Sequence, residues 1–494
     1  MSHAKLILSV DQGTTNSKAI LVDRGGVIRA RASRPVSITF PQPGWVEQDA
    51  RDIWTSVRLV TEDCLSQALG AEIAAVGISN QRESVIVWDR STGEPAGPCV
   101  IWQCRRTTGF CDELRTRGLE ASIRERSGLP VDPLFSASKI RWLLSSIPDG
   151  MARAAAGDLC VGTVDSWLLW NLTGGKEHHT DASNASRTQL LDLKSCSWDP
   201  ELLEIFGIPK GCLPEVRPSS GIAGVTAACG TLPAGVPVAS LIGDSHAALV
   251  GHAAFTPGAV KATYGTGSSL MSPLGNAVLS RHGLSTTVAW SQPGCVRYAL
   301  EGNITNTGGT VQWLAGLLQL AGPEAVAALA DGLPDSGGVY LVPAFAGLGT
   351  PHWDAGSRGV IAGLTRGTTT AHLARAAIES IAYQVCDVFD AMRQDAGLPL
   401  PALYADGGAS RNNSLMQFQA DILGCPVIRS ESADLSAIGA AWLAGLATGF
   451  WSSLEELDAL PRPYTKFEPQ MDDVRRRQLL AGWHEAVRRT RSGA

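Results

Sequence analysis

The 494-residue sequence lacks the patterns that mark several common classes of protein. Its 11 cysteines are scattered, with no Cys-x-x-Cys pair and no neighbouring histidine cluster, which argues against a zinc site or a disulfide framework. Because thiols stay reduced inside cells, we expect free cysteines and a cytoplasmic protein. No uninterrupted apolar run approaches the roughly 20 residues that span a bilayer, so we expect no membrane contact. The first apolar run stops at Asp11 without a basic region before it, so we expect no signal peptide.

A basic composition and the common phosphate-binding fingerprints are also missing. The formal net charge is −6 at pH 7, which argues against nucleic acid as the main partner. Neither a Walker P-loop nor a Gly-x-Gly-x-x-Gly motif occurs. The chain is too long for one hydrophobic core, so we expect two large domains. We place them at residues 1–255 and 256–494, with the boundary at Thr256-Pro257-Gly258.

The sequence does have a carboxylate and a polar turn directly after an apolar run. Residues 6–22 contain two short β-branched runs on either side of Gly13, which predicts a strand, a tight turn and a second strand. Asp11 would face a metal ion, while Thr14, Thr15 and the backbone N–H groups of the turn would receive phosphate oxygens. A hairpin with a polar tip explains the same residues, since turns are rich in Asp, Gly and Thr.

Two further glycine-rich turns follow apolar runs later in the chain. They are Tyr264–Ser269, with the sequence Tyr-Gly-Thr-Gly-Ser-Ser, and Ala405–Asn413. Three such turns indicate a nucleotide held between two halves of the chain. Both halves follow a meander with alternating helices and strands, which predicts two α/β domains of related topology facing one cleft.

Charged residues follow two predicted buried strands. A strand over residues 71–79 leads into Arg82 and Glu83, and a strand over residues 237–241 leads to Asp244 at the start of a helix. Ligands of α/β sheets gather at the carboxyl ends of strands, so these three side chains are candidate site residues. The alternatives are a surface ion pair for the first two and a helix N-cap for the third.

Two other segments are predicted from composition. Residues 181–191 begin with a polar, serine-rich stretch, which predicts irregular structure. The arginines of residues 475–489 interleave with Leu479, Leu480 and Trp483, which predicts an amphipathic helix packed on the second domain.

Several ordered motifs carry a resemblance to a known family. They are Asp11-Gln-Gly-Thr-Thr, Gly77-Ile-Ser-Asn-Gln-Arg-Glu, Trp102-Gln-Cys-Arg-Arg, Tyr264-Gly-Thr-Gly, Gly347-Leu-Gly-Thr-Pro, Met416-Gln-Phe-Gln and a second signature at Gly359–Glu379. Along nearly its whole length the sequence resembles the FGGY carbohydrate kinases, and within them it is most similar to the glycerol kinases. The resemblance implies an α/β fold of two actin-like, ribonuclease H-like ATPase domains flanking a catalytic cleft. It also implies transfer of the γ-phosphate of ATP to a primary hydroxyl, with Mg2+.

The resemblance also implies roles for single residues. Asp244 matches the general base, and Asp11 and Asp244 match carboxylates near Mg2+. Arg82, Glu83 and Trp102 match the acceptor site, although Trp102 could also belong to the core. The positions that match nucleotide contacts are Thr14, Thr15, Lys18, Thr266, Gly308, Gln312, Gly408 and Asn412.

The sequence departs from the glycerol kinases at three acceptor-pocket positions. Leu134 stands where they have a Tyr that bonds the acceptor, Ser245 where they have a Gln beside the base, and Ser269 where they have a Phe that packs on glycerol. These changes enlarge the pocket, and each lost contact costs about 1–3 kcal/mol. We therefore expect a larger acceptor, a four- or five-carbon polyol or ketose such as apulose, erythrulose, ribulose or xylulose.

Two alternatives to that acceptor hypothesis stay open. One is a glycerol kinase that forms sn-glycerol 3-phosphate and tolerates the three substitutions. The other is a non-catalytic, actin-like nucleotide-binding protein, which the retained Asp244, Arg82 and Glu83 argue against, because a sensor needs no base. His246 would either bond an extra hydroxyl of the acceptor or face solvent at a helix start.

Regulation and assembly are predicted from the resemblance alone. Bacterial glycerol kinases carry a glycine-rich basic loop for fructose 1,6-bisphosphate, but the matching stretch Ala227–Pro233 has no Lys or Arg, so we expect no such anion site. Lys18 stands where those enzymes carry Arg. A homodimer or tetramer is plausible by analogy only.

Overall fold

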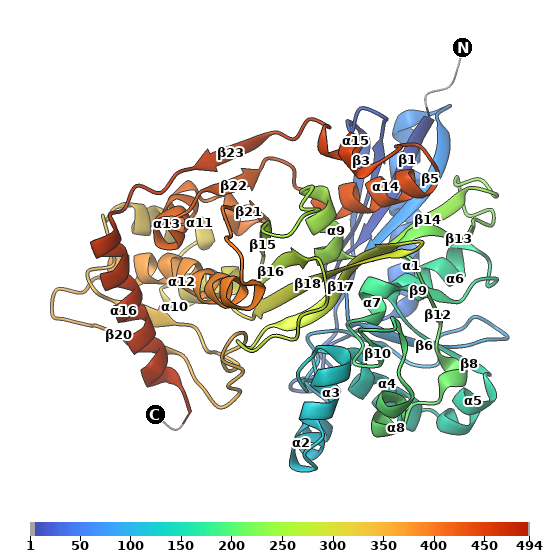
Figure 1. Cartoon of the computed structure of the whole chain (residues 1–494), viewed down its shortest axis with the longest axis horizontal. Helices are drawn as coiled ribbons and strands as arrows, with labels where there is room; N and C mark the ends of the chain where they lie inside the picture. Colours follow the sequence, from blue (N-terminus) through green and yellow to red (C-terminus); the bar gives the residue numbers. More distant parts are fainter. Residues whose placement is uncertain (1–4, 493–494) are drawn as a thin grey trace.

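The computed structural model describes residues 5–492, which form two lobes, each built on a mixed β-sheet (Figure 1). The first sheet has the order β13-β14-β5-β1-β2-β3. Its strands are β1 (Lys5–Gln12), β2 (Asn16–Val22), β3 (Ile28–Pro35), β5 (Glu72–Asn80), β13 (Ser220–Val225) and β14 (Pro237–Gly243). The second sheet has the order β17-β18-β16-β15-β21-β22-β23. Its strands are β15 (Val260–Tyr264), β16 (Ser268–Leu274), β17 (Ser285–Gln292), β18 (Cys295–Ile304), β21 (Leu403–Asp406), β22 (Val427–Ser430) and β23 (Tyr464–Phe467).

Helices and smaller sheets surround the two sheets. The helices of the first half are α1 (Ala50–Leu65), α2 (Thr108–Thr116), α3 (Glu120–Ser127), α4 (Ser136–Ser146), α5 (Gly150–Ala156), α6 (Val164–Leu172), α7 (Ala182–Ala185), α8 (Pro200–Phe206) and α9 (Asp244–Gly251). Those of the second half are α10 (Gly308–Leu317), α11 (Pro323–Asp331), α12 (Thr370–Ala396), α13 (Asn413–Leu423), α14 (Leu435–Ala447), α15 (Leu454–Asp458) and α16 (Asp473–Thr490). The remaining strands are β4 (Glu47–Gln48), β6 (Val85–Asp89), β7 (Cys99–Val100), β8 (Leu159–Thr163), β9 (His179–Asp181), β10 (Leu191–Asp192), β11 (Ser197–Trp198), β12 (Glu215–Arg217), β19 (Tyr340–Val342) and β20 (Val360–Ala362).

Five strands in each sheet follow the same plan. In the first lobe β1, β2 and β3 form an antiparallel meander, and β5 and β14 add in parallel on the other side of β1. In the second lobe β15, β16 and β18 repeat the meander, and β21 and β22 add in parallel beside β15. The prediction of two α/β domains of related topology is therefore confirmed. Within residues 5–492, no helix combines the length and apolarity that crossing a bilayer requires.

The opening hairpin forms as the sequence predicts. Residues 6–10 of β1 are buried, and the N–H of Gly13 donates to the carbonyl of Asn16 over 2.9 Å to close the turn. The antiparallel register places Asp11 opposite Lys18. The carboxylate and the ammonium thus emerge side by side at the end of the sheet where β5 and β14 also end.

Helix α14 packs on the first lobe. It comes late in the chain, yet it lies beside β1 and β5 of the first sheet and packs closely on α9 (Figure 1). Small residues make this approach possible: a Cβ added to Gly439 would lie 1.9 Å from the carbonyl oxygen of Ala247. The predicted boundary at residues 256–258 falls between α9 and β15 and stays a prediction, since part of the second segment packs on the first sheet.

Residues 181–191 differ from the prediction of irregular structure. Asp181 ends β9 and caps α7, accepting hydrogen bonds from the N–H groups of Ser183 and Asn184 over 2.8 and 2.9 Å. Most side chains of the segment are buried. Its serines and threonines bond one another and the second lobe, for example Ser186 to Thr287 over 2.6 Å. A polar composition therefore marks an internal polar layer here. The predicted C-terminal amphipathic helix forms as α16.

The contact between α9 and α14 gives a prediction about stability. We expect Gly439→Ala to force the helices apart and lower the free energy of unfolding by about 2 kcal/mol, the usual scale of overpacking. Thermal unfolding of the purified variant measures the effect. The control is Gly109→Ala in α2, where an added Cβ meets nothing within 4 Å. An unchanged melting temperature in Gly439→Ala would show that this packing contributes little.

Candidate active site

Polar side chains from three parallel strands meet at the carboxyl end of the first sheet. Asp11 lies near the end of β1 and accepts a hydrogen bond from Ser79 Oγ of β5 over 2.8 Å. Asp244 is the first residue of α9, directly after β14. Arg82 follows β5, and its Nε donates to Asp244 Oδ1 over 3.1 Å. The strand ends therefore bring together the residues that the sequence predicted there.

A buried charge cluster connects this group to the second lobe. Glu301 of β18 accepts from Arg82 Nη1 over 2.5 Å and pairs with Arg187 Nη1 at 2.5 Å. Arg187 in turn donates from Nε to Glu83 over 2.6 Å. Although burial opposes ionisation of Glu301, the charges of Arg187 and Arg82 outweigh it and hold its pKa below the usual value.

The backbone at Glu83 is itself constrained. Its φ of 60° lies in the left-handed region, which costs about 1 kcal/mol or more for a non-glycine residue and needs support from its surroundings. Ser136 Oγ donates to the carbonyl of Glu83 over 3.1 Å, and Arg187 holds its carboxylate. The surface ion pair considered for Arg82 and Glu83 is wrong, because both residues are buried and each pairs with a different partner.

Ser245 and Ser269 lie in a second chain of hydrogen bonds beside Asp244. Lys261 of β15 donates from Nζ to Ser245 Oγ over 2.5 Å, and Ser245 Oγ donates to Ser269 Oγ over 2.8 Å. Ser269 Oγ then donates to Glu301 Oε1 over 3.0 Å. Burial lowers the pKa of Lys261 to about 8, with the charge of nearby Asp406 acting against that shift.

The two aspartates have the chemistry of a magnesium site. Burial raises the pKa of Asp11 to about 6; Lys18 opposes the shift, and the charge of Asp244 adds to it. Burial also raises the pKa of Asp244, against the effect of Arg82. A bound cation would stabilise the charged form of both carboxylates, against the effect of burial. Among residues 5–492 no three His, Cys, Asp or Glu side chains form a metal cage. Mg2+ is commonly bound by one or two carboxylates plus phosphates and water, so this pair fits it.

The turn after β1 and the strand that follows it have partners far away in the sequence. Trp102, expected at the acceptor site, donates from its indole Nε1 to Thr14 Oγ1 over 2.8 Å, while Thr15 is exposed. Lys18 forms an ion pair with Asp434 at 3.7 Å. The hydrogen bond from Trp102 therefore stabilises the turn that is predicted to receive phosphate.

The nucleotide positions of the second lobe gather around two glycine turns. The N–H of Gly308, at the start of α10, donates to the carbonyl of Gly265 over 3.0 Å, and a Cβ on Gly308 would lie 2.6 Å from that oxygen. Thr266 is exposed beside this contact, as is Gln312 on α10.

The third turn offers a similar approach to a ligand. A Cβ on Gly408 would meet nothing within 4 Å. Asn412 caps α13, its side chain accepting from the N–H of Leu415 over 2.9 Å. Because Asn412 caps α13, the backbone N–H groups of this turn lie at the N-terminus of a helix, a position that favours anions.

Two further candidates for the acceptor site, Leu134 and His246, lie near the charge cluster. Leu134 is half-buried two residues before Ser136, the side chain that bonds the carbonyl of Glu83. His246 is fully buried, and its Nε2 lies 3.2 Å from Thr287 Oγ1. The solvent-facing alternative for His246 is therefore wrong, and its bond to an acceptor hydroxyl stays a prediction.

Sequence reasoning missed three members of this cluster: Arg187, Glu301 and Lys261. Lys261 interrupts an otherwise apolar strand, and Glu301 lies inside a buried one, so a charge within an apolar run was a usable signal. Arg187 had no comparable signal, because it lies in a segment that is polar throughout.

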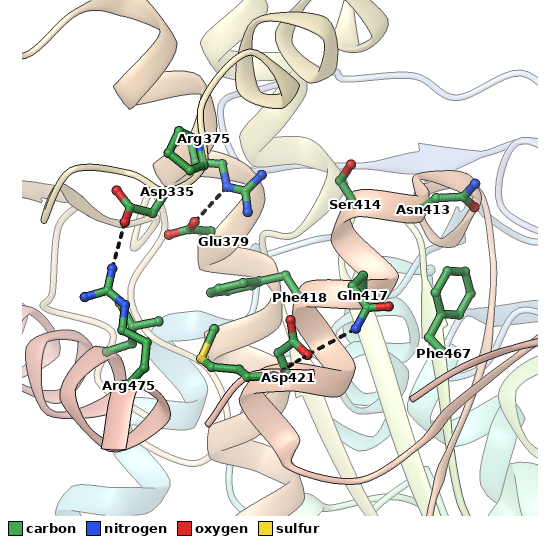
Figure 2. Close-up of a pocket in the computed structure, with 13 residues that line it drawn as sticks. Asp335, Arg375, Glu379, Asn413, Ser414, Gln417, Phe418, Asp421, Phe467 and Arg475 are labelled. Atoms are coloured by element: carbon green, nitrogen blue, oxygen red, sulfur yellow. Dashed lines mark hydrogen bonds and ion pairs between the residues drawn. The ribbon is translucent and has the colours of Figure 1, made fainter. Parts of the chain in front are cut away.

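A separate cavity of about 510 Å³ opens on the second lobe between α12, α13 and α16 (Figure 2). Figure 2 shows Arg375 paired with Glu379 at 2.8 Å and Arg475 paired with Asp335 at 2.8 Å along its walls. None of the predicted site residues lines it. The candidate active site is thus the polar group at the strand ends and not this cavity.

This fold and site define a carbohydrate kinase. The family model of the FGGY carbohydrate kinases matches with its N-terminal domain over residues 6–251 and with its C-terminal domain over residues 260–448. The chain belongs to this family and is an ATP-dependent phosphotransferase with an alcohol group as acceptor.

The chain is similar over its full length to named members of this family. Glycerol kinase of Stenotrophomonas maltophilia is 50% identical over 490 residues, 98% of each chain. Glycerol kinase of Carboxydothermus hydrogenoformans is 48% identical over 99% of this chain and 98% of its own. The crystal structure of Plasmodium falciparum glycerol kinase with ADP superimposes with a TM-score of 0.92 at 32% identity, over 100% of this chain and 99% of that one. Xylulose kinase from Rhodospirillum rubrum gives 0.86 at 26% identity, over 98% of each chain.

The charge cluster leads to a prediction about acceptor binding. We expect Glu301→Gln to leave Arg82 and Arg187 without their shared anion and to raise the KM for the alcohol acceptor at least tenfold, since unpairing buried charges costs about 3–5 kcal/mol. The KM for ATP should change little. Steady-state kinetics with each substrate varied in turn separates the two. Glu468→Gln, which removes a surface glutamate paired with Lys466, is the control. Equal changes in both KM values would contradict a local role.

Proposed function

We propose that the protein transfers the γ-phosphate of ATP to a primary hydroxyl of glycerol, with Asp244 as the base. The hydrogen bonds and the exposure of this carboxylate are the observations that carry the proposal. Its Oδ1 accepts from both Arg82 Nε and the N–H of Ser245, over 3.1 and 2.6 Å, while Oδ2 accepts from none of residues 5–492. The side chain is 37% exposed, so a hydroxyl can reach the unused oxygen. The curated relatives at 48–50% identity, all named glycerol kinase, support glycerol as the acceptor.

The mechanism follows from the two oxygens of Asp244. The acceptor hydroxyl would donate to Oδ2, attack phosphorus in line and give up its proton late in the reaction. Burial favours the protonated carboxyl, so Asp244 can hold that proton until the product leaves. Mg2+, bound by Asp11 and Asp244 with phosphate oxygens, would offset the charge on the transferred group.

The remaining predicted residues surround the reacting groups. We place the phosphates at Thr14, Thr15, Lys18 and Thr266, and the rest of the nucleotide along Gly308, Gln312, Gly408 and Asn412. Arg82, Glu83 and Trp102 would border the acceptor together with Leu134, Ser245 and Ser269. The cytoplasmic location and the homo-oligomer stay predictions.

A larger acceptor is the second candidate. Ser269, on the expected wall of the acceptor pocket, is bonded to Ser245 and Glu301, so that side of the site is lined by short hydroxyl side chains. Such a wall leaves room for a four- or five-carbon polyol or ketose. The relatives favour glycerol over this hypothesis.

Turnover of Asp244→Asn tests the base. We expect kcat to fall by at least about a thousandfold, because general-base catalysis contributes 10²–10⁴-fold and Asn also weakens the hold on the cation. ADP binding measured by calorimetry should persist. The control is Asp335→Asn, which removes a carboxylate that pairs with Arg475 in the separate cavity of the second lobe. ATP turnover that survives in Asp244→Asn would favour the non-catalytic nucleotide-binding hypothesis.

A coupled ADP-release screen decides between the two acceptor sizes. The panel holds glycerol, erythritol, threitol, erythrulose, apulose, ribulose, xylulose and xylitol. We expect the highest kcat/KM with glycerol. A higher value with a C4–C5 compound would support the enlarged pocket. In that case the triple variant Leu134→Tyr, Ser245→Gln, Ser269→Phe should return preference to glycerol by about tenfold or more, since filling apolar space is worth 10–200-fold.

A further inference from the structure

The hydroxyls of Ser245 and Ser269 have a fixed direction of hydrogen bonding. At one end of their chain stands the Lys261 ammonium, which can only donate, and at the other stands the Glu301 carboxylate, which accepts. Lys261 also donates to Thr263 Oγ1 over 3.0 Å, which holds its Nζ in place. Glu301 is kept as an anion by ion pairs at 2.5 Å to Arg82 and Arg187. Neither end can reverse, so the two serines between them cannot reverse either.

Counting protons and lone pairs shows what this wall can offer. A serine hydroxyl has one proton and two lone pairs. Ser245 Oγ accepts a hydrogen bond from Lys261 and donates one to Ser269 Oγ, which in turn donates one to Glu301. Each hydroxyl then has one lone pair left to accept a further hydrogen bond and no proton left to donate one. A serine side chain could ordinarily rotate to donate or accept, but here both can only accept.

Arg82 supplies a hydrogen-bond donor to the same site, where the two serines can only accept. Its Nε and Nη1 bond Asp244 and Glu301, while Nη2 donates to none of residues 5–492. Arg82 Nη1 and Ser269 Oγ donate to the same oxygen, Glu301 Oε1, so the guanidinium and the serines are neighbours. A substrate oxygen between them would meet a donor on one side and lone pairs on the other. A hydroxyl satisfies both, because it accepts from the guanidinium and donates to a serine. A carbonyl oxygen satisfies only the first and turns its own lone pairs toward those of the serines.

We propose that Ser245 and Ser269, polarised between Lys261 and Glu301, make this acceptor site select a polyol over the corresponding 2-ketose. The inference rests on the proposed kinase function and specifies its substrate class. It separates two classes that pocket size alone leaves together, since erythritol and erythrulose have the same numbers of carbons and oxygens and differ only at C2, which carries a hydroxyl in one and a carbonyl in the other. Ser245 and Ser269 become specificity residues through the direction of their protons as well as through their size.

Matched substrate pairs test the proposal. The readout is the ratio of kcat/KM for glycerol to that for dihydroxyacetone, and for erythritol to that for erythrulose, in the coupled ADP assay. We expect both ratios to exceed one in the unaltered protein. Ser269→Ala releases the proton of Ser245 to donate to a carbonyl, so we expect the ratios to fall about fivefold, the worth of one hydrogen bond.

Three variants keep the test specific. Ser269→Thr retains a hydroxyl between Ser245 and Glu301 and should restore the ratios. Ser272→Ala, on the same strand, loses a 3.0 Å bond to the carbonyl of Ala259 and should leave the ratios unchanged. Thermal unfolding confirms that Ser269→Ala is folded, and Ser269→Gly, which also frees the Ser245 proton, provides a second measurement.

The outcomes distinguish the inference from the function on which it rests. Unchanged ratios in both Ser269→Ala and Ser269→Gly would overturn the inference and leave the kinase function intact. Preference for dihydroxyacetone and erythrulose in the unaltered protein would do the same. Absence of turnover with every alcohol would overturn the proposed function and the inference together.

Discussion

The carboxylate of Glu301 is the group on which the polar interior of this protein depends. It comes from the second lobe and holds two arginines of the first, together with the hydroxyl of Ser269. Buried arginines without a shared anion would repel each other in a medium that screens poorly. Around Glu301, the cations Arg82, Arg187 and Lys261 lie among the anions Glu83, Asp244 and Glu301. An uncharged alcohol can enter such a group without adding a net charge to it.

The position of Asp244 follows from packing as well as from charge. Asp244 begins α9, and α9 is pressed against α14 through residues that lack side-chain bulk, notably Gly439 and Gly251. A Cβ on Gly251 would lie 2.4 Å from the carbonyl oxygen of Leu435. The same helix therefore presents the carboxylate to the site and packs both against α14 and against β15, β16 and β17 of the second sheet. Its orientation is fixed at one end by Arg82 and along its length by α14.

The sequence predicted the elements and the turns well, because these are local. The strands before Asp11, Arg82 and Asp244 are short apolar runs, and their common parallel direction places all three at one end of a sheet. The family motifs then supplied the predicted roles. The partners could not be predicted in the same way. Arg187 is 104 residues from Glu83, and Glu301 is 219 residues from Arg82, so neither pair has a spacing to detect. In residues 181–191 polarity signified burial among hydrogen bonds, which composition alone cannot distinguish from exposure.

The path of α14 also limits how the two lobes can move. The chain passes from the first lobe to the second between α9 and β15, returns between β22 and α14, and leaves again between α15 and β23. Three chain crossings therefore connect the lobes, and they limit how far the lobes can slide or separate. Because Glu301 belongs to the second lobe and Arg82 to the first, any movement of one lobe relative to the other would change the length of their ion pair. Movement of the lobes and the electrostatics of the candidate active site are therefore coupled.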